Sequence, residues 1–325
     1  KNNPIFAKDL KAEGAMTVLL KDAIKPNLVQ TLEHSPAIIH GGPFANIAHG
    51  CNSIIATKTA MKLADYAITE AGFGADLGAE KFLDIKCRQA NIQPNVVVCV
   101  ATIKALKYHG GVSKEHILEE NMEALEKGMS NLYKHVDNIR GKFGLNIIVA
   151  INKYNTDSEK EIEFVQNELE KREIMSSVVE SWAKGGEGAI DISNKIIDLA
   201  EKENKFEYMY ALEETIVEKI NNVAMRIYGA KGVIYPEDVT KKIEEMGYGN
   251  LPICIAKTQY SFSDDAKNLE CDEPFEINVR DVELKAGAGF IVVLAGKIMT
   301  MPGLPKIPAA ESIDIDENRK ITGIF

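Results

Sequence analysis

Continuous runs of apolar and β-branched residues, separated by helix-like segments, most constrain how this chain can fold. The six candidate strands are Ala37–His40, Tyr66–Glu70, Val96–Ala101, Ile147–Ile151, Ser176–Val179 and Phe290–Leu294. Most of them are uninterrupted rather than alternating, which is typical of strands that a parallel sheet buries on both faces. Alternation of strands and helices through short loops predicts an α/β fold with a doubly wound, mostly parallel sheet.

Segments with helical spacing lie between these runs. The first covers Cys51–Ala64, and the longest covers Ser113–Arg140, where apolar residues recur at gaps of four and three. Coiled coils also have that spacing, but we interpret it as a long helix that faces the core of an α/β domain. A capping box formed by Thr156 and Glu159 predicts that the next helix begins there and runs through Leu169.

The sequence changes character after Lys195, where charge-rich helical segments follow one another. These segments are Ile196–Lys205, Leu212–Tyr228 and Pro236–Met246. From Gly249 onward we expect turns and short strands, and three prolines make the tail extended rather than helical. We therefore divide the chain into an α/β core over 1–140, a second α/β lobe over 141–270, and strands with an irregular tail over 271–325 that packs on the core.

Composition narrows the possible classes of protein. The 325 residues are 45% hydrophobic and 26% charged, as in ordinary globular proteins, and carry a net charge of −10. The acidic balance argues against nucleic-acid binding, and the longest apolar runs are too short to span a membrane. Five scattered cysteines without a C-x-x-C pair indicate a reducing compartment, so we expect a cytoplasmic protein.

Two glycine-rich segments follow expected strands and precede expected helices. The first contains Gly41, Gly42 and Asn46, and the second contains Gly72 and Gly74. Glycine allows an anion to approach the backbone closely, and helix N-termini carry partial positive charge. We expect these five residues to face one another across a cleft and to bind phosphate, although tight turns alone would also require glycine.

The second segment is spaced G-x-G-x-x-x-G, one residue too long for the dinucleotide fingerprint. Asn91 and Gln93 stand where that fingerprint needs an acidic residue, which argues against an NAD-dependent oxidoreductase. Glu70 and Asp76 flank the glycines, and carboxylates of this kind can hold Mg²⁺ through water. They are therefore the candidate metal ligands.

No G-x-x-x-x-G-K-[ST] phosphate loop occurs in the sequence. Lys58 and Lys81 lie in expected helices, and we expect both to point to solvent. The cation that neutralises a transferring phosphate is therefore not expected in this chain.

Aromatic and basic residues follow three of the expected strands. Trp182, the only tryptophan, and Tyr154 each come after a strand, where flat rings suit a planar heterocycle, although a lone tryptophan is often a core residue. Lys104, Lys107 and His109 follow another strand. They are either solvent-facing or hold a polyanionic ligand tail.

Six motifs together carry a family resemblance over the whole chain. They are HGGPFANIAHGCNS (His40–Ser53), TEAGFGADLGAEKF (Thr69–Phe82), VATIKALKYHGG (Val100–Gly111), WAKGGEG (Trp182–Gly188), KTQYSFSDD (Lys257–Asp265) and MPGLPKIPAA (Met301–Ala310). In this order they resemble formate–tetrahydrofolate ligase, and the likeness continues to the closing ITGIF.

The resemblance implies ATP-dependent ligation of formate to tetrahydrofolate through formyl phosphate, giving 10-formyltetrahydrofolate. It implies a P-loop-NTPase-like core, a folate-binding lobe over 141–270, ATP with Mg²⁺, an optional monovalent cation and a homo-oligomer. It places the pterin between Trp182 and Tyr154, where phenylalanine is usual at the second position. It also places Pro274 near the adenine base.

One part of the family pattern has no counterpart here. The family carries its phosphate-loop lysine, and an arginine associated with formyl phosphate, in an N-terminal portion that nothing in this sequence matches. We therefore expect the chain to be the C-terminal part of a longer enzyme, with the N-terminal part as its partner. A catalytically inactive fragment that binds only folate or oligomeric partners is the alternative.

Overall fold

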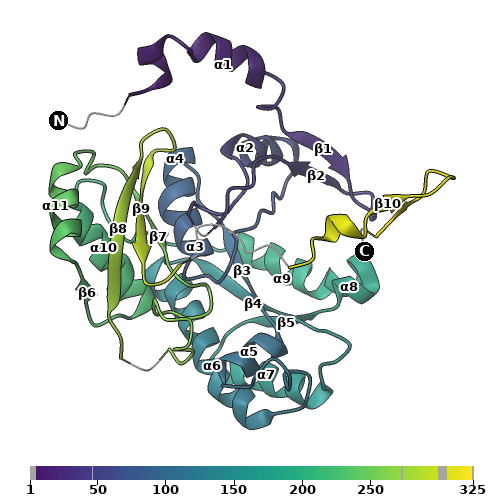
Figure 1. Ribbon diagram of the computed structural model, residues 1–325. Coiled ribbons are helices and arrows are strands. Elements are labelled where there is room, and N and C mark those ends of the chain that lie inside the picture. Colours follow the sequence, from purple (N-terminus) through teal and green to yellow (C-terminus); the bar gives the residue numbers. More distant parts are fainter. Residues whose placement is uncertain (1–4, 46, 272–273, 299–305, 324–325) are drawn as a thin grey trace.

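The computed structural model describes residues 5–45, 47–271, 274–298 and 306–323. They form a mixed α/β structure with two main sheets, one of three parallel strands and one of four mixed strands (Figure 1). The α/β class is therefore confirmed, and the parallel strands form one of the two main sheets.

The parallel sheet has the order β3-β4-β5. Its strands are β3 (Val96–Ala101), β4 (Asn146–Asn152) and β5 (Ser176–Val179), which confirms three of the predicted strands. Alternate residues of β4 pack on opposite sides: Ile148 contacts the cluster of α9 (Ile190–Ala200), and Val149 belongs to the main core.

Helices therefore cover both faces of the parallel sheet. On the main-core side lie α6 (Met122–Asp137) and α7 (Glu159–Lys171), whose apolar residues share one buried cluster with β4. α5 (Ile103–His109) follows β3 directly and packs along α6. This local arrangement is the doubly wound pattern that the sequence predicted, limited to three strands.

The second sheet has the order β6-β8-β9-β7 and curls into a half-barrel. Its strands are β6 (Val233–Ile234), β7 (Ile253–Ala256), β8 (Ile277–Lys285) and β9 (Phe290–Ala295). β9 lies antiparallel to β8 and parallel to β7. The predicted strand Phe290–Leu294 is thus present, but in the mixed sheet.

A continuous helical stretch joins the two sheets. It consists of α3 (Gly78–Lys81), a π-helical turn (Phe82–Cys87) and α4 (Arg88–Ala90). Leu83 packs in the main core, whereas Ile85 packs against β7 and β9. This stretch also continues directly from the second glycine-rich segment, so both sheets contribute to the position of that segment.

The N-terminal part differs from the prediction. After α1 (Glu13–Leu20), β1 (Asn27–Gln30) and β2 (Pro36–Ile39) form an antiparallel hairpin of mostly exposed residues. The strand expected at Ala37–His40 is therefore β2 of a hairpin and not part of a buried parallel sheet. Tyr66–Glu70 forms no strand, because this exposed segment has no neighbouring strand to pair with.

Several helix boundaries also shift. α2 (Ile54–Leu63) agrees with its prediction, but α6 begins only after its cap Asn121, so 113–121 is not helical. The capping box of α7 is formed by Ser158 and Glu161 and not by Thr156 and Glu159.

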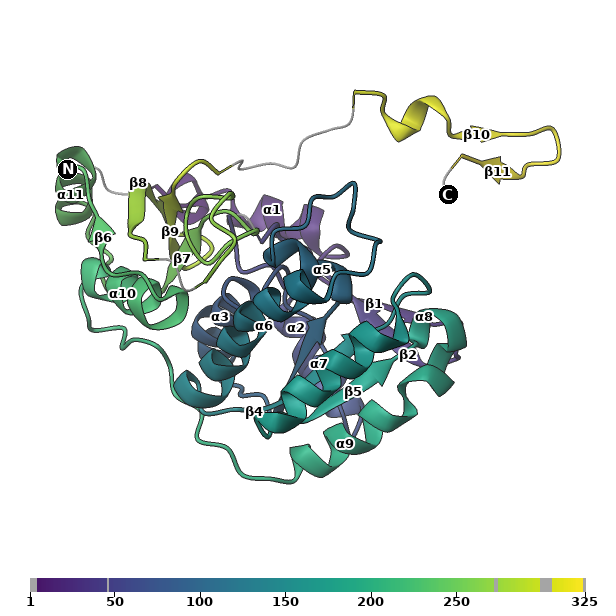
Figure 2. The same ribbon diagram turned by 90° about the horizontal axis from the view of Figure 1, so that it is seen from below.

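The remaining helices and the tail complete the chain. The helices are α8 (Ser181–Lys184), α10 (Ile216–Val223) and α11 (Glu237–Glu245). Residues 306–323 are exposed throughout and carry the short hairpin β10 (Asp314–Ile315) and β11 (Ile321–Thr322) (Figure 2). This part of the tail extends outward, unlike the packed tail that we expected.

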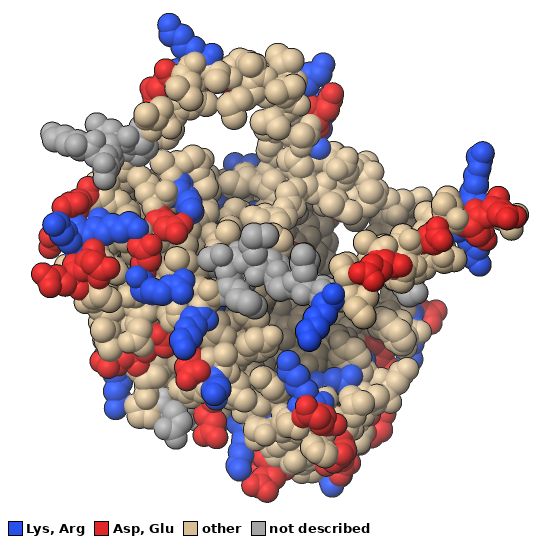
Figure 3. Space-filling model, viewed as in Figure 1, with Lys and Arg blue, Asp and Glu red and all other residues tan. Residues whose placement is uncertain are grey.

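The surface agrees with the expectations from composition. On the face viewed in Figure 3, Lys and Arg are interspersed with Asp and Glu, so that face has no extended basic surface for nucleic acid. Within the described ranges, no helix combines the length and the apolar composition that crossing a bilayer requires.

Candidate functional site

Three predicted ligand-binding side chains lie beyond the carboxyl ends of the parallel strands. Lys104 follows β3, Tyr154 follows β4 and Trp182 follows β5, and these strands are neighbours in the sheet. Trp182 is 83% exposed and Tyr154 is 41% exposed. Carboxyl ends of parallel strands are the usual place for ligands in α/β sheets. The structure thus brings the two predicted aromatic residues to one edge.

The Tyr154 ring already has one neighbour. The Lys104 ammonium lies 4.4 Å from its centroid, which is a cation–π contact. Lys107, the other basic residue of α5, is buried in an ion pair of 2.9 Å with Glu161. Lys107 is therefore structural, and only Lys104 of this pair lies beside the aromatic edge.

Charged groups surround the same edge. Lys153, next to Tyr154, forms ion pairs with Glu159 and, at 3.9 Å, with Glu180. Lys184 also pairs with Glu180, and this hydrogen bond lowers the pKa of the Glu180 carboxyl. The edge therefore holds an ionised carboxylate two residues before Trp182.

The β1–β2 hairpin supports the loop that follows Trp182. The Gly186 amide donates a hydrogen bond of 3.1 Å to the Glu33 carboxylate at the hairpin tip. Gly185 has φ of 59°, and a Cβ there would lie 2.0 Å from Glu33 Oε1. The positive φ therefore requires glycine at 185, whereas the exposed Glu33 side chain could move away from an added Cβ. Figure 2 shows the hairpin beside α8.

The two glycine-rich segments are in direct contact. The Gly72 amide donates to the Gly50 carbonyl at 2.9 Å. A Cβ on Gly72 would lie 3.1 Å from that carbonyl oxygen, and a Cβ on Gly78 would lie 2.0 Å from the Gly72 oxygen. These glycines allow the close approach of the two segments, which is made through Gly50 and Gly72. That Gly41 and Gly42 face Gly72 and Gly74 across a cleft stays a prediction, and the strand expected before the second segment is absent.

The predicted phosphate-binding glycines differ in their surroundings. Gly41 adopts φ of 67° and Gly42 has open space around its Cβ position. A Cβ on Gly74 would lie 2.7 Å from Asp76 Oδ1. Asn46 lies outside the described residues. The phosphate role of these positions stays a prediction.

Between Gly72 and Gly74 lies a residue that sequence reasoning missed. Phe73 has φ of 67°, a left-handed conformation that bulky residues rarely adopt, and its ring is 46% exposed. An aromatic residue flanked by glycines was the available signal.

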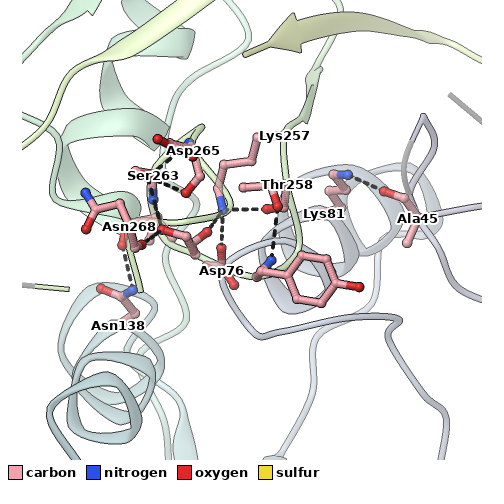
Figure 4. A network of polar contacts seen from close by, with 12 residues as sticks. Ala45, Asp76, Lys81, Asn138, Lys257, Thr258, Ser263, Asp265 and Asn268 are labelled. Atoms are coloured by element: carbon pink, nitrogen blue, oxygen red, sulfur yellow. Dashed lines mark hydrogen bonds and ion pairs between the residues drawn. The ribbon is translucent and has the colours of Figure 1, made fainter. Parts of the chain in front are cut away.

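Buried lysines hold the first glycine-rich segment. Lys81 donates to the Ala45 carbonyl at 2.7 Å (Figure 4), and Lys86 donates to Asn52 Oδ1 at 2.7 Å. The same Asn52 oxygen accepts from Thr69 at 3.1 Å and so links the two segments. The prediction that Lys81 points to solvent is wrong, whereas Lys58 is exposed as predicted.

The two candidate metal ligands lie in different environments. Asp76 is buried and forms an ion pair of 2.7 Å with Lys257, which also donates to the Thr258 carbonyl (Figure 4). Burial alone would raise the pKa of Asp76, but Lys257, His135 and the hydrogen bonds to the carboxylate together lower that pKa. Glu70 is exposed. The ion pair with Lys257 accounts for the burial of the Asp76 carboxylate. Among the described residues, no group of three or more His, Cys, Asp or Glu side chains could hold a metal ion.

A buried carboxyl pair was not foreseen from the sequence. Burial raises the pKa of Glu80 well above its ordinary value and that of Asp84 to about 7. Neither oxygen of Glu80 has a hydrogen-bond partner, nor has the nearby Tyr228 hydroxyl. The signal in the sequence was the spacing of four residues between two acids in a helical stretch that also contains Phe82, Leu83 and Ile85.

The end of the VATIKALKYHGG motif and the segment that follows the KTQYSFSDD motif meet at a cavity of about 310 Å³. It is lined by His109, Gly111, Lys267, Asn268, Leu269 and Glu270. His109 ends α5, and Lys267–Glu270 follow the KTQYSFSDD motif. Pro274, predicted near the adenine base, is exposed shortly before β8 and is not among the lining residues.

Comparison with known protein families gives a match that covers the whole sequence. The family model described as formate–tetrahydrofolate ligase matches residues 1–325. All six motifs, the aromatic edge and the paired glycine-rich segments lie within the matched range. This chain belongs to the formate–tetrahydrofolate ligase family.

Proposed function

We propose that this chain binds the pterin of tetrahydrofolate and faces the phosphate in the ATP-dependent formylation of tetrahydrofolate. Family membership implies ATP-dependent formyltetrahydrofolate synthesis. The observation that carries the finer assignment is the placement of Trp182 and Tyr154 beyond adjacent strand ends. Two exposed rings beyond the ends of neighbouring strands fit a planar ligand better than they fit a core.

The proposed reaction has two steps. Formate attacks the γ-phosphate of ATP, so that a C–O–P bond forms and ADP leaves. The N10 nitrogen of tetrahydrofolate then attacks the formyl carbon of formyl phosphate, and inorganic phosphate leaves as the C–N bond forms. The acyl phosphate must be kept from water, and the charge of the transferring phosphate must be neutralised.

Different residues of this chain bind the pterin and the phosphate. Trp182 and Tyr154 hold the pterin, and Lys104 supports the outer face of the Tyr154 ring. The paired glycine-rich segments, including Gly41, Gly42, Gly72 and Gly74, present backbone groups to phosphate.

We assign the nucleotide to a different part of the chain from the pterin. The cavity between His109 and Lys267 has the size and the mixed polar lining that suit a base, and we assign the adenine of ATP to it. Mg²⁺ accompanies ATP and neutralises phosphate charge, but the buried pair of Asp76 with Lys257 does not fit a metal ligand. A homo-oligomer and an N-terminal partner complete the proposal.

A non-catalytic role as a folate-binding fragment is the second candidate. The absence of a G-x-x-x-x-G-K-[ST] sequence favours it. Formate-dependent release of ADP after addition of the N-terminal part of a family member separates the two candidates, because only the enzyme couples formate to ATP cleavage.

Calorimetric titration with tetrahydrofolate tests the pterin site. Tyr154→Ala and Trp182→Ala are each expected to weaken binding by about 1–3 kcal/mol, the range measured for aromatic stacking on nucleobases. Tyr248→Ala is the matched control, because Tyr248 is 40% exposed, like Tyr154, but lies after α11. Equal affinities of all three variants would contradict the proposal.

A further inference from the structure

Two lysines lie beneath the first glycine-rich segment. The Lys81 side chain is fully buried and Lys86 is 1% exposed, and both come from the helical stretch that joins the two sheets. Lys81 donates to the Ala45 carbonyl at 2.7 Å. Lys86 donates to Asn52 Oδ1 at 2.7 Å and to Thr57 Oγ1 at 2.8 Å.

Neither ammonium group has a counter-charge in the part of the chain that the structure describes. Lys107 and Lys257, which are equally buried, have carboxylates at 2.9 Å and 2.7 Å. The oxygen partners of Lys81 and Lys86 are neutral, and no carboxylate of a described residue lies within 4.0 Å of either. Burial raises the pKa of Glu80, the residue before Lys81, and so favours its uncharged form.

Another buried lysine, Lys219, shows an ammonium whose three donors all have acceptors. Lys219 has no carboxylate either, but it donates to three carbonyls, those of Leu212, Gly249 and Leu251, at 2.7, 2.6 and 3.1 Å. An ammonium has three donors, so Lys219 is fully satisfied and structural. Lys81 donates to the Ala45 carbonyl and hydrogen-bonds the Cys254 thiol. Lys86 donates to two oxygens and lies 4.9 Å from the centroid of the Phe82 ring. Unlike Lys219, neither ammonium has three oxygen acceptors among the described residues.

The charges of Lys81 and Lys86 affect His49 in the first glycine-rich segment. His49 lies in the same segment, and its buried Nδ1 has no hydrogen-bond partner among the described residues. Burial lowers the pKa of His49, and Lys86 and Lys81 lower it further. In a low-dielectric interior, charges interact over several ångströms. The two lysine ammonium groups therefore favour binding of an anion at this segment.

We propose that Lys81 and Lys86 form a phosphate-oxyanion site with the segment that contains His49. The inference rests on the proposed function, which assigns the glycine-rich segments to phosphate, and it names the cations that neutralise the ligand. The chain thus supplies positive charge to the phosphoryl group from beneath the loop, a role that the sequence alone left without a residue.

Inorganic phosphate is the probe, added at constant ionic strength against chloride. A ligand that binds only the folded state raises the midpoint of thermal unfolding. Phosphate is expected to raise the midpoint of the wild-type chain and of Lys58→Gln, whose side chain is exposed on α2. Lys81→Gln and Lys86→Gln keep a donor but lose the charge, and are expected to bind phosphate at least tenfold more weakly by calorimetry.

Hydrogen exchange on the wild-type chain is the second measurement, which needs no buried substitution. Phosphate is expected to slow exchange in peptides covering 47–57 and 78–88. The inference is overturned if phosphate leaves the wild-type midpoint and these peptides unchanged, or if Lys81→Gln and Lys86→Gln fold and respond as Lys58→Gln does. Folate binding, followed separately through Trp182, distinguishes this failure from a failure of the proposed function.

Discussion

Individual buried charges hold the candidate site together. The ion pair of Asp76 with Lys257 joins the second glycine-rich segment to the KTQYSFSDD motif, which is 181 positions away in the sequence. His135 lies within electrostatic reach of Asp76 and stacks on Phe262, with ring centroids 4.6 Å apart. The position of the glycine-rich segment therefore depends on single side chains from distant parts of the chain.

The Lys257 ammonium is expected to be essential for stability. Lys257→Met leaves the Asp76 carboxylate buried without a partner, and breaking a buried pair in this way costs about 3–5 kcal/mol of unfolding free energy. Urea denaturation measures the loss. Lys285→Met is the control, because its pair with Glu283 is exposed and is worth less than about 1 kcal/mol. Equal losses in both variants would contradict a buried pair.

His135 predicts a pH dependence of stability. Burial lowers its pKa from 6.5 to about 4. The unfolded chain therefore binds this proton more readily, so stability falls as the pH drops from 6.5 towards 4. Between pH 7 and pH 5 the wild type is expected to lose about 2 kcal/mol more than His135→Phe, which keeps the ring stacking. Identical pH profiles of the two proteins would show that His135 is not buried in its neutral form.

At the scale of elements, the loops rather than the strands decide the geometry of the candidate site. Trp182 is carried by the short helix α8, and the following loop is held by Glu33 of the β1–β2 hairpin. The hairpin has few buried residues of its own, so this contact is its link to the aromatic edge.

Gly185→Ala tests that link. The added Cβ would meet Glu33 Oε1 at 2.0 Å and would occupy a backbone conformation with φ of 59°. We expect a loss of about 1–3 kcal/mol in stability, together with weaker folate binding. Gly186→Ala is the matched control, because its Cβ would lie 3.4 Å from the same carboxylate without positive φ. Equal effects of both substitutions would exclude the strained contact.

The strands show how far sequence could predict the fold. Val96–Ala101, Ile147–Ile151 and Ser176–Val179 were predicted because helices cover both of their faces, which leaves continuous apolar runs. Tyr66–Glu70 has a similar composition but finds no partner strand, and pairing between distant segments cannot be read from a local pattern. The true capping box at Ser158 and Glu161 was missed because Thr156 and Glu159 satisfy the same rule two residues earlier.

Some residues of the candidate site could be predicted from the sequence, and others could not. Trp182 and Tyr154 were predictable because each follows a recognisable strand. The buried state of Lys81 was not, since it depends on the loop that folds over it, and a lysine in a helix is usually exposed. The partners of Asp76 were equally hidden, because Lys257 approaches from another sheet.

For the whole molecule, the two sheets share one buried core, and the candidate ligand regions lie around it. The aromatic edge belongs to the parallel sheet, while the second glycine-rich segment continues into the helical stretch that contacts both sheets. The family match over 1–325 agrees with one functional unit that uses residues from all of these parts.

A turnover assay tests whether this chain alone catalyses the reaction. We expect the isolated 325 residues to show no formate-dependent release of ADP, because the sequence lacks a G-x-x-x-x-G-K-[ST] loop. A coupled ADP assay with and without formate measures this, and adding the N-terminal part of a family member is expected to restore release. Turnover by the chain alone would mean that Lys81 and Lys86 suffice as catalytic cations.

The central claim is that this chain binds the pterin at Trp182, and the fluorescence of that residue tests it most directly. Trp182 is the only tryptophan and is 83% exposed, so its emission reports one position. Folate is expected to quench the emission in a saturable manner, whereas p-aminobenzoylglutamate, which lacks the pterin, is expected to leave it unchanged after correction for absorbance. Unchanged emission at saturating folate, or equal quenching by both compounds, would contradict the account.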